Sequence, residues 1–257
     1  VIGTLKKYGF SYMKMDYNDT IGIGCDGAES LGEGLRQNMV ASLAFIRRIK
    51  AEIPGIILEN CSSGGHKLEP LMMSACSMAS FSDAHECEEI PIIAANLHRA
   101  VLPRQSQIWA VIRRSDSLKR IAYSVAATFL GRMCISGDVR ELSDAQWKVL
   151  DDGIAFYKKI APVIKKGFTY RYGTEITSYR HPHGWQGVLR VGEDGGAVAV
   201  FHGFHGAAGV RASVPVPDGC RITAVYSSEA EQAVIRDGCL ELIFSDDMKA
   251  VAVSLEQ

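Results

Sequence analysis

The segment Phe10-Ser-Tyr-Met-Lys14-Met-Asp16 is a short, largely apolar run that ends in a carboxylate, and Met78-Ala-Ser-Phe81-Ser-Asp83 has the same form. Short apolar runs of this kind are typical of buried strands. A carboxylate placed where such a strand meets solvent contributes little to packing, but a rigid strand can aim it into a shared cleft. In a barrel of alternating strands and helices, catalytic groups lie at this end of the strands. We therefore treat Asp16 and Asp83 as candidate catalytic residues, with capping of the following turn as the alternative for each.

Residues 1–165 alternate short apolar runs with longer helical patterns. The expected strands are Ser11–Met15, Gly55–Leu58, Met78–Phe81, Gln107–Ile112 and Arg132–Ile135. Strands that alternate with helices form a parallel sheet. Five such units are too few to close an eight-stranded barrel. The pattern therefore predicts an α/β fold in which residues 1–167 are the C-terminal part of a (β/α)8 catalytic barrel, that is, strands 4–8 in the second half of a TIM barrel.

The two clearest helical patterns are Leu31–Ile53 and Asp144–Ile164, in which apolar residues recur every three or four positions. The expected buried face of the first helix consists of Leu35, Met39, Leu43, Ile46 and Ile49. A serine before each helix, with Glu or Gln three residues later, predicts a capping box. The two pairs are Ser30 with Glu33 and Ser143 with Gln146.

The pattern changes near Gly167 to short strands separated by turns. The expected strands are Val188–Val191, Ala197–Phe201, Cys239–Phe244 and Ala250–Leu255. The turns between them contain Gly195-Gly196, Pro217-Asp-Gly219 and Asp237-Gly238. We therefore predict that residues 168–257 form a small antiparallel β-sandwich domain after the barrel.

The composition excludes several functional classes. The chain has 257 residues, of which 47% are hydrophobic, and a formal net charge of −1, which gives no attraction to nucleic acid or acidic membranes. Its apolar runs are all shorter than the roughly 20 residues of a membrane span. The seven cysteines contain no Cys-x-x-Cys pair and suit a reducing compartment, so we expect a cytoplasmic protein. Because the chain begins with Val1 and not with Met, we expect it to be the C-terminal part of a longer polypeptide.

Two carboxylates that face each other across a sugar can cleave a glycosidic bond, one as nucleophile and the other as proton donor. Asp16 and Asp83 are 83 − 16 = 67 residues apart, which corresponds to two strand–helix units. Lys14 lies on the same side of its strand as Asp16 and could keep that carboxylate ionised, or form a plain ion pair with it. Asn18 supplies a neutral donor and acceptor, or a turn. The loop Glu59-Asn-Cys61-Ser-Ser-Gly64-Gly65-His66 would let the backbone approach a ligand, or is an ordinary turn.

These motifs resemble the C-terminal half of glycoside hydrolase family 36, the bacterial and plant α-galactosidase family. Tyr12-Met-Lys14-Met-Asp16-Tyr-Asn18 resembles the Lys-Trp-Asp-Met-Asn strand that carries the family's nucleophile. Glu59-Asn-Cys61-Ser-Ser-Gly64-Gly65 resembles its Glu-x-Cys-Ser-Gly-Gly-Gly loop, and Ser82-Asp83 resembles its acid/base strand. Ile135-Ser-Gly137-Asp138 and the segment 156–167 resemble the end of its barrel, so the resemblance extends over residues 8–167.

The resemblance implies a retaining, exo-acting hydrolase that removes terminal α-linked galactose from oligosaccharides, without a metal or an organic cofactor. It implies Asp16 as nucleophile, Asp83 as acid/base, and Lys14, Asn18, Cys61 and Gly64 as sugar contacts. An α-N-acetylgalactosaminidase of the same family and a catalytically silent carbohydrate-binding fragment are the alternatives. We expect the complete protein to be a homo-oligomer that binds oligosaccharide, with no nucleic-acid or membrane partner.

The chain departs from the family at several positions. Met15 replaces the Trp before the nucleophile, Tyr17 replaces Met, and Asp19 stands where Arg is common. After Ser82-Asp83 the family often has Asp-Thr-Asp, whereas this chain has Ala84-His85-Glu86. We expect these changes to alter the pocket wall, and so to weaken the galactose assignment more than the reaction class. The family's early-barrel aspartate pair, which binds the sugar's O4 and O6 hydroxyls, has no counterpart in these residues.

Two other patterns indicate different functions. Gly22-Ile-Gly24-Cys-Asp-Gly27 fits a dinucleotide-binding pattern, but it does not directly follow a strand, so we expect a loop that covers the site. His181-Pro-His183 and His202-Gly-Phe-His205 could bind zinc, but no cysteine pair lies nearby, and we expect surface turn histidines. His85 could tune the pKa of Asp83 or be a plain loop residue.

Overall fold

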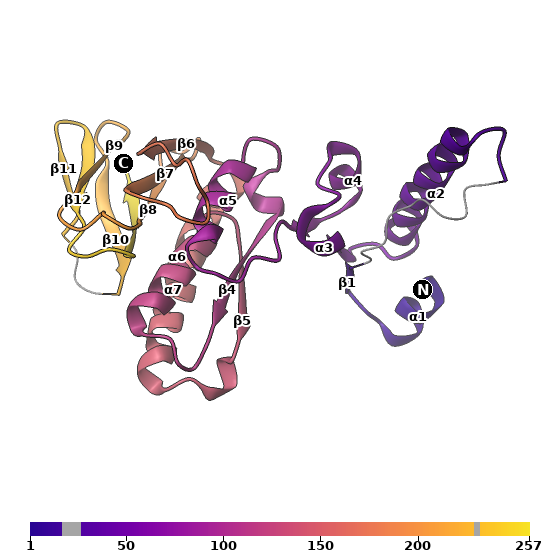
Figure 1. Cartoon of the computed structure of the whole chain (residues 1–257), viewed down its shortest axis with the longest axis horizontal. Coiled ribbons are helices and arrows are strands. Elements are labelled where there is room, and N and C mark those ends of the chain that lie inside the picture. The colour runs from indigo at the N-terminus through magenta and orange to yellow at the C-terminus, as the bar shows by residue number, and fades with distance from the viewer. Residues whose placement is uncertain (17–26, 229–231) are drawn as a thin grey trace. The chain divides into compact units, whose positions relative to one another are not determined.

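The computed structural model describes residues 1–16, 27–228 and 232–257. These residues form two compact units, Val1–Asp83 and Ala84–Gln257, which are described separately below and whose elements are labelled in Figure 1. Asn18 lies outside the described residues, as do Tyr17, Asp19 and all but the last residue of the glycine-rich stretch 22–27.

The first unit consists of parallel strands joined by helices. Its elements are α1 (Ile2–Tyr8), β1 (Tyr12–Met15), α2 (Leu31–Glu52), β2 (Ile57–Asn60), α3 (Ser62–Gly65), α4 (Pro70–Ala75) and β3 (Met78–Ser80). Strand β2 pairs in parallel with both β1 and β3. The first three expected strands and their parallel arrangement are therefore confirmed, with boundaries that differ by one to two residues.

Helix α2 is buried along only part of its expected apolar face. Leu43, Ile46 and Ile49 lie in the hydrophobic core of the first unit. Leu35 and Met39, about two turns and one turn nearer the N-terminus than Leu43, are 39% and 49% exposed. The prediction of one continuous buried face is thus correct for the C-terminal half of the helix and wrong for its N-terminal half.

The expected capping boxes differ between the two long helices. At α2 the Ser30 hydroxyl accepts a hydrogen bond from the Glu33 N–H at 3.2 Å, but the Glu33 carboxylate accepts from Arg36 and Gln37. These bonds lower the pKa of Glu33 to about 2. At α7 (Asp144–Lys166) both halves of the box are present, as predicted.

The second unit begins with helices and two parallel strands. These elements are α5 (Glu89–Leu97), the 3-10 turn η1 (Pro103–Gln105), β4 (Ser106–Ile112), α6 (Leu118–Thr128), β5 (Arg132–Gly137), the 3-10 turn η2 (Val139–Glu141) and α7. Strands β4 and β5 pair in parallel in the predicted places. Helix α6 is buried from Ile121 to its end, and it packs against β4 and α7.

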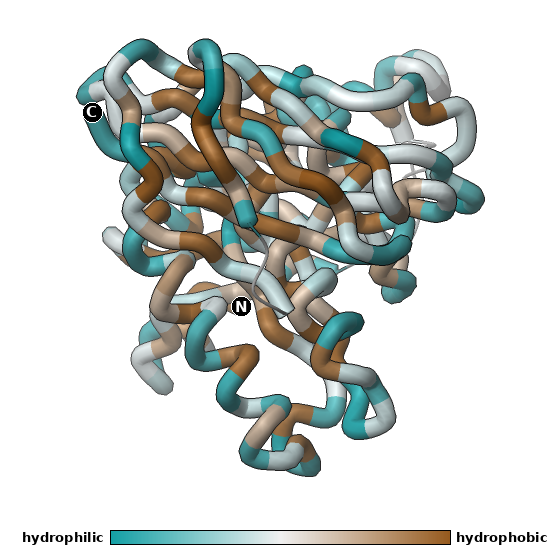
Figure 2. The backbone as a smooth tube through the Cα atoms, turned by 90° about the vertical axis from the view of Figure 1, so that its left-hand side faces the viewer, coloured by the Kyte–Doolittle hydropathy of each residue, from teal (hydrophilic) through white to brown (hydrophobic). Residues whose placement is uncertain are grey.

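Antiparallel strands complete the second unit. They are β6 (Phe168–Gly173), β7 (Trp185–Val191), β8 (Ala197–Gly203), β9 (Arg211–Pro215), β10 (Arg221–Ser227), β11 (Val234–Arg236), β12 (Cys239–Ile243) and β13 (Ala250–Glu256). They form one sheet in the order β10-β13-β8-β7-β6 and another in the order β11-β12-β9. One buried cluster draws residues from both sheets, among them Phe201, Val253, Val214 and Leu242, and apolar positions recur along these strands in Figure 2.

Four of these strands, β6, β9, β10 and β11, are absent from the expected set. Strand β6 exposes Phe168 (62%) and Tyr170 (49%), so its apolar residues do not mark a buried face. Strand β10 contains a register shift between Ile222 and Ala224, which breaks the alternation that identifies a strand.

Candidate functional site

Strand β1 places Lys14 and Asp16 on one side of the sheet, as their spacing predicts. The Lys14 Nζ lies 3.4 Å from the Asp16 Oδ2, and the two side chains are 35% and 44% exposed. A hydrogen bond from the Cys61 thiol lowers the pKa of Asp16, and the Lys14 cation and the Ser63 N–H act in the same direction. Asp16 is therefore ionised at neutral pH, which is the state that a nucleophilic carboxylate needs.

The turn after β2, which we call the Cys61–Gly65 turn, has an unusual backbone. Ser62, Ser63, Gly64 and Gly65 all have positive φ, at 51°, 54°, 63° and 123°. The Cys61 N–H donates to the Met15 carbonyl at 3.1 Å, which ties the turn to the end of β1. Left-handed serines cost about 1–2 kcal/mol each, so the surrounding contacts must hold them in place. This conformation brings the Ser63 N–H to the Asp16 carboxylate.

The other side of the same turn contacts Asp83. A Cβ atom on Gly64 would lie 2.3 Å from the Asp83 backbone nitrogen and 2.6 Å from its Oδ1. A Cβ atom on Gly65 would lie 2.7 Å from the Phe81 carbonyl oxygen. The end of β3 therefore packs directly on the turn, and only glycine fits at Gly64.

The first unit thus brings together five of the six residues predicted for the site. These are Lys14, Asp16, Cys61, Gly64 and Asp83, and the sixth, Asn18, lies outside the described residues. Asp16 and Asp83 both contact the Cys61–Gly65 turn, one through Cys61 and Ser63 and the other through Gly64. The arrangement places an ionised carboxylate with a cation, and a second exposed carboxylate, around one short loop.

A family model named Melibiase matches residues 2–167. This chain belongs to the Melibiase family. The resemblance to glycoside hydrolase family 36 is therefore confirmed.

Individual relatives agree with the family. Alpha-galactosidase 1 of Pediococcus pentosaceus is 25% identical over 189 residues, which are 68% of this chain and 25% of that protein. The GH36 alpha-galactosidase AgaA of Geobacillus stearothermophilus, in complex with 1-deoxygalactonojirimycin, aligns over 99% of this chain and 36% of its own, with a TM-score of 0.80 and 15% identity. The alpha-galactosidase of Lactobacillus brevis aligns with a TM-score of 0.76 and 15% identity over 98% of this chain and 36% of its own. This chain thus shares the fold of the aligned part of these enzymes and spans about a third or less of their length.

One buried carboxylate next to the predicted site was not singled out from the sequence. Glu59 is 2% exposed and accepts hydrogen bonds from the hydroxyls of Tyr12 and Ser80. The sequence carries a partial signal for this cluster, because Glu59 and Ser80 are polar residues in short, otherwise largely apolar strands. Without the strand register, that signal does not show which residues meet.

The histidines considered as zinc ligands or as neighbours of Asp83 have different environments. His202 is completely buried on β8 and packs edge-on against Tyr123 at 4.9 Å, so the expectation of a surface turn is wrong for this residue. His183 and His205 face each other with ring centroids 6.1 Å apart. Among residues 1–16, 27–228 and 232–257, no three His, Cys, Asp or Glu side chains are placed to hold a metal ion. His85 stacks on Trp109 at 5.9 Å, and its influence on Asp83 stays a prediction.

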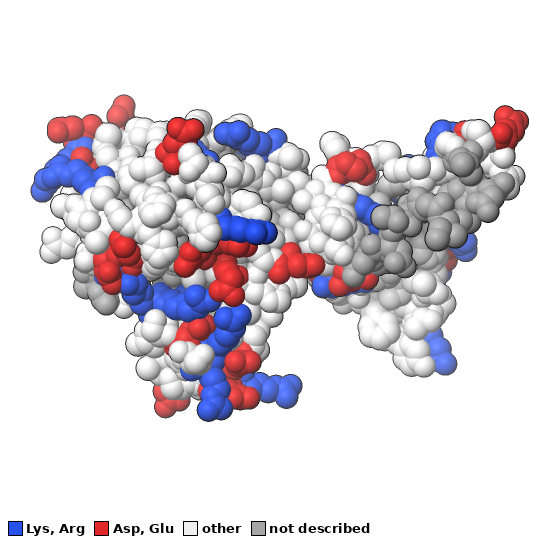
Figure 3. Space-filling view, in the orientation of Figure 1, with Lys and Arg blue, Asp and Glu red and all other residues white. Residues whose placement is uncertain are grey.

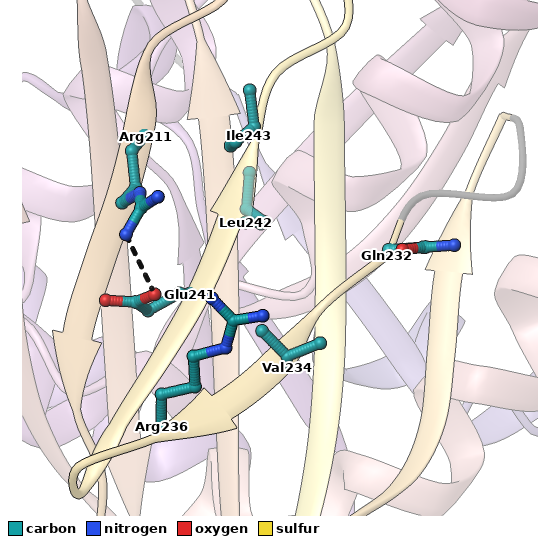
Figure 4. A pocket seen from close by; sticks show the side chains of 7 residues that line it. All are labelled: Arg211, Gln232, Val234, Arg236, Glu241, Leu242 and Ile243. Atoms are coloured by element: carbon teal, nitrogen blue, oxygen red, sulfur yellow. Dashed lines mark hydrogen bonds and ion pairs between the residues drawn. The ribbon is translucent and has the colours of Figure 1, made fainter.

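The cavities and surface charges give further context. A cavity of about 320 Å³ in the first unit is lined by Met13, Met15, Asp16, Ser42, Phe45 and Ile46, so one candidate catalytic residue borders it. A cavity of about 400 Å³ lies on strands β9, β11 and β12, where Arg211 and Glu241 form an ion pair of 3.5 Å (Figure 4). The residues of that second cavity include none of the predicted site.

Acidic and basic side chains are interspersed on the face in Figure 3, in keeping with the net charge of −1. In the described part of the chain, the helices are all too short or too polar to cross a membrane.

Replacing Gly64 with Ala tests the contact between the turn and Asp83. Gly9 offers a matched control, because it has nearly the same φ (67° against 63°) but would place its Cβ in open space. Gly9→Ala should cost about 1–2 kcal/mol of unfolding free energy, from backbone strain alone. Gly64→Ala should cost a further 1–3 kcal/mol or so, because the added methyl overlaps Asp83. Urea unfolding followed by circular dichroism measures both, and equal losses would contradict the contact.

Replacing Cys61 tests the electrostatics of Asp16. In the unchanged protein, the carboxyl pKa of Asp16, followed by carbon-13 NMR, should lie below its ordinary value of 3.8. Cys61→Ala removes the thiol donor, so the pKa should rise, whereas Cys61→Ser keeps a donor and should preserve most of the depression. The stability that this depression contributes is present above pH 3.8 and is lost as the pH falls through the lower, folded-state pKa. An unchanged pKa in Cys61→Ala would show that the thiol does not bind Asp16.

Proposed function

We propose that the protein carrying this chain is a retaining, exo-acting glycoside hydrolase that removes terminal α-linked galactose from oligosaccharides. The observation that carries the proposal is that Asp16 and Asp83 both contact the Cys61–Gly65 turn, with Asp16 ionised beside Lys14. Two carboxylates of opposite role around one sugar are the requirement for hydrolysis with retention. Family membership supports the same reaction class.

The reaction proceeds in two steps. In the first, the Asp16 carboxylate attacks the anomeric carbon, the bond to the leaving oxygen breaks, and Asp83 gives its proton to that oxygen. In the second, Asp83 takes a proton from water, the water oxygen bonds to the anomeric carbon, and Asp16 leaves as a carboxylate. The two inversions restore the original configuration. Lys14, Cys61 and Gly64, together with Asn18, contact the sugar hydroxyls in this proposal.

The substrate class is supported by the relatives. Variants of AgaA have been crystallised in complex with raffinose and with stachyose. Both sugars end in α-linked galactose, so oligosaccharides of this kind are the substrates we propose for this chain. An α-N-acetylgalactosaminidase is the second candidate, because positions that the family uses near the nucleophile are changed here, as at Met15.

We also infer a reducing, cytoplasmic location and a homo-oligomeric state for the complete protein. Three of the cysteines in the described residues, Cys61, Cys76 and Cys87, are buried. Burial raises the pKa of both Cys76 and Cys87 to about 11, so these thiols stay protonated and unreactive at neutral pH. Such buried thiols suit a compartment in which disulfides do not form.

Asp16→Ala should abolish hydrolysis of 4-nitrophenyl α-galactoside by the complete protein, because no covalent intermediate can form. We expect kcat to fall by at least about a thousandfold, as for other lost nucleophiles. Asp151→Ala, on the exposed side of α7, is the control and should leave kcat unchanged. Retained turnover in Asp16→Ala would remove Asp16 from the mechanism. A parent protein that binds galactosides without hydrolysing them would support the silent carbohydrate-binding alternative.

Asp83→Ala should affect substrates according to their leaving group. Raffinose has a poor leaving group and needs protonation, so its hydrolysis should slow by about 10²–10⁴-fold. Glycosylation by 4-nitrophenyl α-galactoside should slow much less, because nitrophenolate leaves without a proton. The comparison uses the steady-state rates on both substrates. The glycosylation step with 4-nitrophenyl α-galactoside is followed separately, as the initial burst of nitrophenol. Equal loss on the two substrates would contradict an acid role for Asp83.

A further inference from the structure

One buried arginine joins the helices of the second unit to its antiparallel strands. Arg190 lies on β7 and is only 1% exposed. Its Nε donates a hydrogen bond to the Thr169 hydroxyl on β6 at 3.0 Å, and its Nη2 donates to the Leu130 carbonyl, shortly after α6, at 3.0 Å. The same Nη2 lies 3.3 Å from the Nδ1 of His98, the residue that follows α5. Arg190 therefore connects the sheet to the ends of two helices.

The hydrogen-bond partners of Arg190 are all uncharged. A buried guanidinium is costly without a carboxylate, yet no carboxylate of the described residues forms an ion pair with Arg190. Burial lowers the pKa of Arg190 to about 10, and Tyr157 on α7 acts in the opposite direction. Arg190 is thus a cation at neutral pH that neutral acceptors hold in the interior.

His98 can accept this hydrogen bond in one protonation state only. A guanidinium has donors and no acceptor, so the Nδ1 that faces it must carry no proton. The neutral ring then holds its proton on Nε2, which is shielded from solvent and has no hydrogen-bond partner among the described residues. A proton on Nδ1 would break the hydrogen bond and place two cations in contact.

Neighbouring elements add positive charge near this contact. Arg171 on β6 donates a hydrogen bond to the Asn96 side chain of α5 at 3.2 Å, and the charge of Arg99, at the end of α5, acts on Arg171. From α7, Tyr157 contributes a phenol. A proton on His98 would therefore join a region that already contains several cations.

The stability of this contact should fall in mild acid. Burial, and next the charge of Arg190, lower the pKa of His98 to about 3, while the Leu130 carbonyl acts in the opposite direction. When the contact is open, His98 titrates near its ordinary value of 6.5. Because the pKa in the folded state is the lower one, the open state takes up a proton first. The stability that neutral His98 contributes is therefore complete above pH 6.5 and is lost progressively as the pH falls toward 3.

We propose that the Arg190–His98 hydrogen bond is an acid-sensitive contact that holds α5 against β6 and β7 and opens when His98 takes up a proton. Two other side-chain hydrogen bonds join these elements, the one from Arg171 and one from Gln186 to the Pro91 carbonyl at 3.1 Å. Both of their acceptors are amide oxygens, which keep accepting in mild acid. In the competing explanation, His98 is protonated only when the whole unit unfolds.

His98→Asn tests the proposal, because its side-chain oxygen can accept from Arg190 and takes up no proton. Hydrogen exchange in the complete protein, followed by mass spectrometry and corrected for intrinsic rates, gives the protection of residues 89–97 at pH 7.5 and pH 5. In the unchanged protein this protection should fall by about 30-fold, because opening takes up one proton below pH 6.5. In His98→Asn it should stay nearly constant. The same pH dependence in both proteins would overturn the proposal.

His181→Asn is the matched control, because it makes the same substitution at an exposed histidine. It should leave the fall in protection of α5 as it is in the unchanged protein. At pH 5, α5 of the unchanged protein should also be less protected than β8 and β13, the inner strands of the sheet. Equal protection of these elements would mean that the unit unfolds as a whole, which contradicts a separate opening of α5.

Arg190→Met tests the other partner, because it removes the guanidinium and leaves an apolar side chain. The protection of α5 should then be lowered already at pH 7.5, as acid lowers it in the unchanged protein. Protection at pH 7.5 equal to that of the unchanged protein would show that Arg190 does not hold α5. If Arg190→Met fails to fold, the comparison between His98→Asn and the unchanged protein still decides the question.

Discussion

The left-handed turn at Cys61–Gly65 is the constraint on which the candidate site depends. Four consecutive residues with positive φ fold the chain back at the end of β2, and the Cys61 N–H fixes the turn to the end of β1. Gly64 then lies so close to Asp83 that no side chain fits between them. Asp16 and Asp83 are exposed residues that follow the buried ends of β1 and β3, and this turn is the element that both of them contact. The strain of two left-handed serines is thus the cost of placing two acids around one loop.

Much of this arrangement follows from the sequence, since parallel strands bring their carboxyl ends to one edge. The apolar runs that end at Asp16 and Asp83 identify those ends, and the spacing of Lys14 and Asp16 predicts their shared side. Strand positions were harder to predict in the C-terminal part. A strand such as β6, which exposes Phe168 and Tyr170, has no alternation between buried and exposed positions. Its place is set by pairing with β7, a long-range contact that local pattern does not encode.

Two further differences have the same origin. Glu59 was noticed only as part of a motif, because its importance depends on which residues lie across from it in β1 and β3. His202 was expected at a surface turn because no cysteine pair lies nearby to complete a zinc site, but strand β8 includes it and its side chain is fully buried. Burial of a polar residue is decided by the packing of α6 over β8, through Tyr123, and a single sequence does not show that packing.

The structure also changes the interpretation of one departure from the family. Met15, which stands where the family has Trp, was expected to alter the pocket wall. It is 7% exposed and belongs to the core of the first unit with Leu43 and Ile46. Strand alternation puts Met15 on the side opposite Lys14, toward α2, where it borders the 320 Å³ cavity together with Asp16. The change from Trp to Met therefore acts on packing against α2 as well as on the wall of the cavity that Asp16 borders.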